Sequence, residues 1–180
     1  MAVRLHYHPF MIDPGTQPDG EEYMSYNRRR WGSDSWTDSM KAMGQMEGAP
    51  YANWKMWPNT THCSRALMLA EKHSLGDALI GKLYSMCYEE GENVSLRDTV
   101  SRAVTVAGVP GGAEFVQGDE GLKELHEELR TATTPSGKRV SAAPTFSIRV
   151  ADSPVGELSG AQDTEHWLSI LEQCKEMFEQ

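Results

Sequence analysis

Three cysteines are the side chains of this sequence best suited to covalent chemistry: Cys63, Cys87 and Cys174. They are odd in number and widely spaced, and no two of them have the Cys-x-x-Cys spacing of a redox dithiol or of a zinc site. Each falls where a small apolar residue would suit a helix face. Cys63 follows His62, but neighbouring residues of a helix do not face each other, so the two do not read as a Cys–His nucleophile pair. We predict three reduced and buried thiols.

Two histidines are the next candidates. His6 and His8 are two residues apart in an alternating segment, and in a strand they would point to the same face, where they could together bind a metal. No carboxylate and no third histidine accompanies them nearby. Chance alternation is the simpler interpretation, so the sequence predicts neither a metal nor another cofactor.

The charge balance excludes several classes of protein. The 180 residues carry 17 Lys and Arg against 26 Asp and Glu, a formal charge of −9. A general nucleic-acid binder would need a basic surface, so that class is disfavoured. No apolar run approaches the roughly 18 residues of a membrane span, and Pro9 interrupts any signal-like start. We expect a protein of the cytoplasm or of an organelle lumen, with no membrane partner.

The order of elements indicates how these residues are positioned. Residues 4–8 alternate and end at Pro9, which is typical of a strand. Alternation returns over 145–150 and in a second strand at 153–158, and a long amphipathic helix follows Asp163. Between these regions, helical spacing of apolar residues appears around 21–31, 40–46, 59–70, 79–87, 96–108 and 122–129. The sequence therefore predicts an α/β or α+β fold with a helical insertion.

Four local patterns, in matching order and spacing over nearly the whole chain, resemble FrnE-type members of the DsbA family. Residues 7–14 (YHPFMIDP) resemble the opening of that family's second strand. Residues 58–67 (PNTTHCSRAL) look like its helix start, with Cys-Ser in place of Ala-His. Residues 143–146 (APTF) are similar to the cis-proline strand entry of thioredoxin-like folds, and residues 159–162 (SGAQ) are similar to the family's Gly-Ala-Gln turn.

The resemblance implies a thioredoxin-like fold interrupted by an all-helical domain. The incomplete thioredoxin-like domain would comprise residues 1–20 and 134–180, and the inserted helical domain residues 21–133. The family activity is thiol–disulfide exchange with a peptide or protein thiol substrate. The bond before Pro144 is expected to be cis. The resemblance implies a substrate groove lined by Ala143, Pro144, Thr145, Trp54, Trp57 and Asn59.

The sequence departs from the family pattern at its start. Family members begin with a strand and a Cys-x-x-Cys helix, a unit of roughly 30 residues, whereas this sequence opens at what resembles the second strand. We therefore expect no dithiol cycling by the chain as given, whether through truncation or natural loss. The absent strand would lie between residues 5–8 and 146–150, and unpaired inner edges are costly. These two strands are expected to pair with each other, or a second copy is expected to fill the gap as a homodimer.

Three functions remain open. The first is a DsbA-like oxidoreductase whose redox motif is missing here. The second is a non-catalytic peptide- or partner-binding module that uses the groove around Trp54, Trp57 and Pro144. The third is a relative of kappa glutathione transferases and hydroxychromene carboxylate isomerases, which share the fold, use a serine instead of the cysteine, and would bind glutathione. The patterns at Asp13-Pro14 and at residues 160–162 favour the FrnE type.

Overall fold

The computed structural model describes residues 2–179, which form two compact units. The larger unit runs from Leu5 to His126, and the smaller unit combines the chain start, through Arg4, with the residues from Glu127 onward. None of the described helices has both the length and the apolar character that crossing a bilayer requires.

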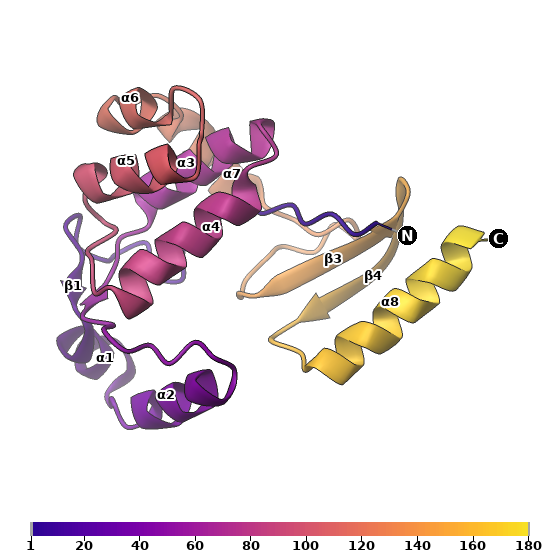
Figure 1. The fold of residues 1–180 in the computed structure, drawn as a ribbon, viewed down its shortest axis with the longest axis horizontal. Helices are drawn as coiled ribbons and strands as arrows, with labels where there is room; N and C mark the ends of the chain where they lie inside the picture. The colour runs from indigo at the N-terminus through magenta and orange to yellow at the C-terminus, as the bar shows by residue number, and fades with distance from the viewer. Residues whose placement is uncertain (1, 180) are drawn as a thin grey trace. The chain divides into compact units, whose positions relative to one another are not determined.

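The larger unit is a helical assembly (Figure 1). Its core is built by α3 (Thr61–Lys72), α4 (Gly76–Tyr84), the π-helix η1 (Ser85–Glu89), α5 (Arg97–Val106) and α6 (Gly112–Gln117), whose inward residues are buried. Alanines in α3 and α5, such as Ala66, Ala70 and Ala103, are fully buried and allow close approach of the neighbouring helices. The helices are α1 (Tyr23–Trp31), α2 (Trp36–Met46), α3 (Thr61–Lys72), α4 (Gly76–Tyr84), the π-helix η1 (Ser85–Glu89), α5 (Arg97–Val106), α6 (Gly112–Gln117) and α7 (Leu122–Thr131), of which α7 crosses the unit boundary.

A short strand pair fixes the start of α1. β1 (Glu21–Glu22) pairs antiparallel with β2 (Met56–Trp57), so that Glu21 lies opposite Trp57. Glu22 also caps α1, because its carboxylate accepts the backbone N–H groups of Met24 at 3.0 Å and Ser25 at 2.7 Å. The pair therefore places the first turn of α1 beside the tryptophan-containing segment 54–57.

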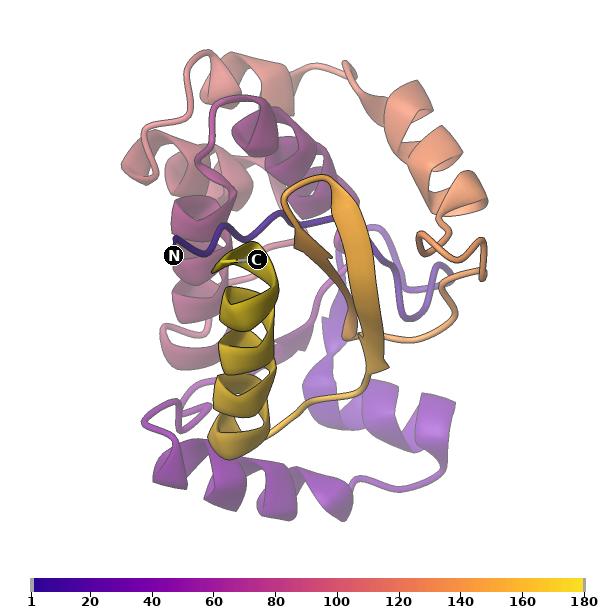
Figure 2. The ribbon, with the colours of Figure 1, turned by 90° about the vertical axis from the view of Figure 1, so that its right-hand side faces the viewer.

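The smaller unit consists of a hairpin and one long helix. β3 (Thr145–Val150) pairs antiparallel with β4 (Ser153–Ser159), with an irregularity between Ile148 and Arg149. α8 (Thr164–Glu179) lies alongside the hairpin (Figure 2), and the ring of its Trp167 meets Phe146 of β3 edge-on at 4.8 Å. The Ala143–Pro144 peptide bond immediately before β3 is cis.

The predicted strand over residues 4–8 is not formed. These residues are irregular in the structure, and β3 has hydrogen bonds only to β4 among the strands of residues 2–179. A strand is formed by backbone hydrogen bonds to a neighbouring strand, and alternation of side chains over residues 4–8 does not by itself provide that neighbour. The strand predicted over residues 4–8 was therefore wrong, while filling of the gap by a second copy stays a prediction.

The division between the units also differs from the expected boundary at residue 20, because residues 5–20 group with the helices. Side chains of the helical unit hold this segment. Tyr26 donates to the Asp13 carboxylate at 3.3 Å, Asn59 donates its side-chain N–H to the carbonyl of Thr16 at 2.9 Å, and Asn93 donates to the carbonyl of Asp19 at 2.8 Å.

Candidate binding pocket

Two indole rings form a platform in the larger unit. The rings of Trp54 and Trp57 are nearly parallel, with centroids 6.0 Å apart and planes 22° apart. Each is backed by a tyrosine of α1: Tyr23 stacks on Trp54 at 4.0 Å, and Tyr26 stacks on Trp57 at 4.1 Å. The two tyrosines are three residues apart in the chain, and so are the two tryptophans. This equal spacing lets each tyrosine of the helix face one tryptophan of the neighbouring segment. The tyrosines are buried and the indoles half-buried, so each indole has one covered face.

A pocket of about 590 Å³ opens at this platform. Its volume is within the range of 300–1,000 Å³ that is usual for ligand sites. We refer to it as the large pocket. Seven aromatic side chains line it, accompanied by Ile12, Met40, Gly48, Ala49, Ser85 and Glu89; the aromatic residues are Trp31, Trp36, Tyr51, Trp54, Trp57, Tyr84 and Tyr88.

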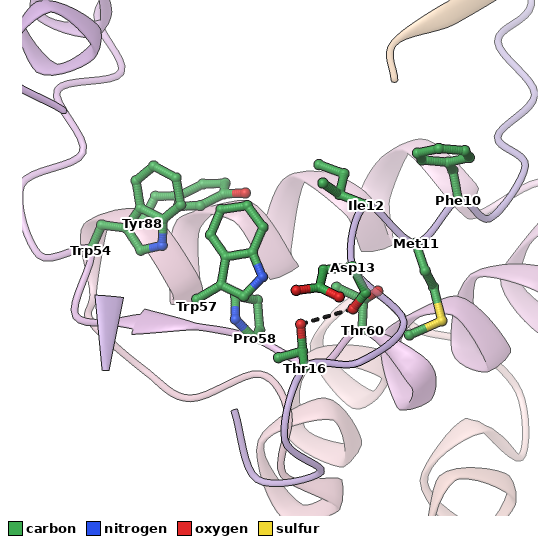
Figure 3. Close-up of a pocket in the computed structure, with 10 residues that line it drawn as sticks. All are labelled: Phe10, Met11, Ile12, Asp13, Thr16, Trp54, Trp57, Pro58, Thr60 and Tyr88. Carbon is green, nitrogen blue, oxygen red and sulfur yellow. Dashed lines mark hydrogen bonds between the residues drawn. The ribbon is translucent and has the colours of Figure 1, made fainter. Parts of the chain in front are cut away.

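A second pocket of about 100 Å³ shares Ile12, Trp54, Trp57 and Tyr88 with the large one, and we call it the small pocket. Figure 3 shows Trp54, Trp57 and Tyr88 grouped at one end and Phe10 and Met11 at the other. The remaining lining residues are Asp13, Thr16, Pro58 and Thr60. Residues 10–16, which follow the predicted strand, therefore contribute to this site.

The π-helix η1 supplies one wall of the large pocket. Its Glu89 carboxylate accepts the backbone N–H groups of Tyr51 at 2.9 Å and Ala52 at 3.1 Å. The N–H of Asn53 donates to the carbonyl of Tyr88 at 3.0 Å. Tyr51 has a φ of 53°, a conformation that is uncommon for a bulky residue. These hydrogen bonds hold the loop before β2 against η1 and so fix the relative positions of Tyr51 and Tyr88. Burial raises the pKa of the Tyr88 phenol, which stays neutral.

The three cysteines are free and buried, as the sequence predicts. The Cys63 thiol donates to the carbonyl of Val94 at 3.1 Å. Burial raises the pKa of Cys63 and of Cys87 to about 12, so that neither forms the thiolate needed for attack near neutral pH. Cys63 and Cys87 are packing groups of the hydrophobic core.

The predicted groove residues have different placements. Trp54 and Trp57 line both pockets. Asn59 lines neither; its Oδ1 accepts the N–H of Thr61 at 3.1 Å, and its own N–H donates to the Ser95 hydroxyl at 2.9 Å, so it joins segments of the larger unit. The other three lie in the smaller unit at the start of β3: Ala143, Pro144 and Thr145.

One of the two histidines considered as metal ligands lies next to a carboxylate. His6 Nδ1 lies 3.2 Å from a carboxylate oxygen of Glu71. Within residues 2–179, no group of three or more His, Cys, Asp or Glu side chains could hold a metal ion.

Five aromatic residues of the large pocket were not identified from the sequence as a binding group. Large aromatic rings lie at intervals of three in the segment before and within β2, at Tyr51, Trp54 and Trp57. So many large rings outside a helix could have indicated a binding surface. The others lie in helices, where an aromatic residue ordinarily indicates core packing. The residues missed are Trp31, Trp36, Tyr51, Tyr84 and Tyr88.

No family model and no curated protein matches this sequence. Its structure is similar to the crystal structure of a probable DsbA oxidoreductase from Streptomyces coelicolor, with a TM-score of 0.75 over 92% of this chain and 72% of that chain, at 20% sequence identity. The chain thus has a mixed α/β fold of the DsbA-like kind.

Proposed function

We propose that this chain is a FrnE-type protein of DsbA-like fold that acts as a binding module, holding a segment of a partner chain in its large pocket. The observation that carries the proposal is a pocket of about 590 Å³ with seven aromatic side chains in its lining. The four local patterns of the sequence, which end in the Ser-Gly-Ala-Gln turn at residues 159–162, support the FrnE type.

The pocket has the physical properties that partner binding needs. Tryptophan and tyrosine offer large contact areas at low cost in side-chain entropy, and they are enriched among the residues that dominate binding energy. Stacking on Tyr23 and Tyr26 restrains both indoles before a partner arrives. A preformed site binds more tightly, because less ordering has to occur on association.

The test is a titration with an acetylated and amidated Gly-Leu-norleucine-Leu-Gly peptide, followed through the indole N–H signals by NMR. We expect the signals of Trp54 and Trp57 to shift on binding. Trp31→Leu, which removes a half-exposed ring of the pocket, should weaken binding. Val106→Ala is the matched control, because Val106 is exposed in the same unit and lines neither pocket. The proposal fails if no indole signal of the pocket responds to any peptide.

A second candidate is a thiol–disulfide oxidoreductase whose dithiol is supplied from outside the sequence given, and the fold similarity favours it. The intact mass of the protein purified from its source discriminates the two. A mass above 20.1 kDa by roughly 30 residues, with a Cys-x-x-Cys in the added segment, would favour the oxidoreductase. A mass near 20.1 kDa, together with no reduction of insulin disulfides, would favour the binding module.

A further inference from the structure

The large pocket carries one negative charge. Glu89 is the only acidic or basic residue of the lining, since no Asp, Lys, Arg or His lines this pocket. Its oxygens accept two backbone N–H groups, but no basic side chain in the described part of the chain forms an ion pair with it. The half-buried carboxylate, which no cation neutralises in the described part of the chain, therefore adds a negative potential to the pocket.

The aromatic walls favour the same sign of ligand charge. The face of an aromatic ring is negative, and it attracts a cation placed over it, most often the guanidinium of an arginine. One ring of the lining already takes part in this interaction, because the Arg30 guanidinium lies 4.4 Å from the ring centroid of Trp31. That guanidinium also faces Asp13, with Nε 3.6 Å from a carboxylate oxygen, so its charge is partly neutralised within the protein.

We propose that the large pocket takes a cationic side chain of a partner chain, an arginine, with its guanidinium against the aromatic walls and its charge facing Glu89. This rests on the proposed function, that the pocket binds a partner segment. A planar and weakly hydrated guanidinium loses less on leaving water than a compact ammonium does, and it stacks on aromatic faces. The apolar residues Ile12 and Met40 in the lining favour apolar neighbours beside the arginine.

The test uses four acetylated and amidated peptides Gly-Leu-X-Leu-Gly, in which X is arginine, citrulline, norleucine or glutamate. Citrulline has nearly the shape of arginine without its charge. By isothermal titration calorimetry we expect the arginine peptide to bind about tenfold more tightly than the citrulline peptide. The difference should shrink between roughly 50 and roughly 500 mM NaCl, because salt screens charge. The glutamate peptide should bind most weakly.

The outcomes separate this inference from the proposed function. Equal binding of arginine and citrulline would overturn the cationic ligand and leave the pocket as an apolar binding site. Absence of binding by all four peptides would overturn the proposed function, and the inference with it.

Two pairs of variants test the residues themselves. Tyr84→Leu removes an exposed ring of the pocket and should lower arginine binding, whereas Tyr84→Phe, which keeps the ring, should not. Glu89→Gln should lower the ratio of arginine to citrulline affinity. Glu90→Gln is the control, since Glu90 pairs with Lys82 and does not line the pocket. An unchanged ratio in Glu89→Gln would contradict the role of this carboxylate.

Discussion

Arg65 is the most unusual single residue of the larger unit, because a cation is completely buried there. Its guanidinium donates to the carbonyls of Phe115 at 2.9 Å, Gly118 at 2.9 Å and Glu120 at 2.7 Å. The ring of Phe115 lies beneath it at 5.1 Å. These carbonyls lie in and just after α6, where a helix leaves its acceptors without internal partners. Arg65 of α3 thus closes the C-terminal end of α6 together with Arg97 of α5, which donates to the carbonyls of Val116 and Gln117.

Replacing Arg65 by methionine should therefore be costly. The change removes the donor of the Phe115 and Glu120 carbonyls, whereas the Gly118 carbonyl still accepts from Arg97. We expect it to lower the free energy of unfolding by about 2 kcal/mol or more. Arg102→Met is the matched control, because Arg102 forms an exposed ion pair with Glu92 that is worth less than about 1 kcal/mol. Urea unfolding followed by circular dichroism measures both. Equal losses in the two variants would contradict the role assigned to Arg65.

Buried phenols and thiols predict a loss of stability at alkaline pH. Burial raises the pKa of Tyr26 from 10.0 to about 12 and that of Cys63 from 9.0 to about 12. The folded state then holds protons that the unfolded state releases, so stability is fully present below pH 9 and falls as the pH rises toward 12. Each such group contributes a slope of up to about 1.4 kcal/mol per pH unit.

Tyr26→Phe removes one of these titrating groups, and its slope of unfolding free energy against pH should be shallower than that of the unmodified chain above pH 10. Urea titrations at a series of alkaline pH values give both slopes. Parallel curves would show that the phenol does not titrate as proposed.

At the scale of elements, η1 and the loop before β2 are held together mainly by Glu89. Its carboxylate accepts two adjacent backbone N–H groups, those of Tyr51 and Ala52. Hydrogen bonds to a charged acceptor are worth about 1.5–3 kcal/mol each. We therefore expect Glu89→Ala to accelerate hydrogen exchange at the Tyr51 and Ala52 amides by roughly 10–100-fold. Glu90→Ala should leave these rates unchanged, and equal acceleration in both variants would contradict this tie.

Elements with strong apolar periodicity were predictable from the sequence, and those that depend on tertiary partners were not. The stripe from Leu79 to Cys87 predicted a helix, but not that its end adopts the π geometry of η1, which has no sequence period of its own. The six residues of α6 are too few to show a helical pattern after Pro110-Gly111. Alternation over residues 4–8 predicted a strand, but a strand also needs a neighbour.

Only part of the candidate site could be predicted, because some of its residues are brought together by tertiary contacts. Trp54 and Trp57 stand out as large rings in an irregular segment, whereas Tyr88 and Glu89 reach the pocket only because η1 packs beside the loop that carries Tyr51. No local pattern reports that contact. Likewise, the hydrogen bond from the Asn59 side chain to the Thr16 carbonyl joins segments far apart in the chain, and no local pattern predicts it.

At the scale of the whole molecule, burial is unevenly distributed between the two units. Every residue of the hydrophobic core cluster belongs to the larger unit. In the described part of the smaller unit, only Cys174 and Thr134 are buried. A unit that buries little apolar surface cannot offset the entropy of ordering its chain. The larger unit therefore contains the main source of stability.

Residues 5–126, expressed alone, should fold cooperatively, because they include the core helices, Arg65 with its three acceptors, and both pockets. Well-dispersed amide signals in NMR and a single thermal transition would show this. The fragment should also bind the arginine peptide with an affinity close to that of the full chain, since every lining residue of the large pocket lies within it. The complementary fragment from Glu127 onward should give poorly dispersed signals. Collapse of the dispersion for residues 5–126 would show that the hairpin and α8 supply stabilising contacts that the core of the larger unit cannot replace.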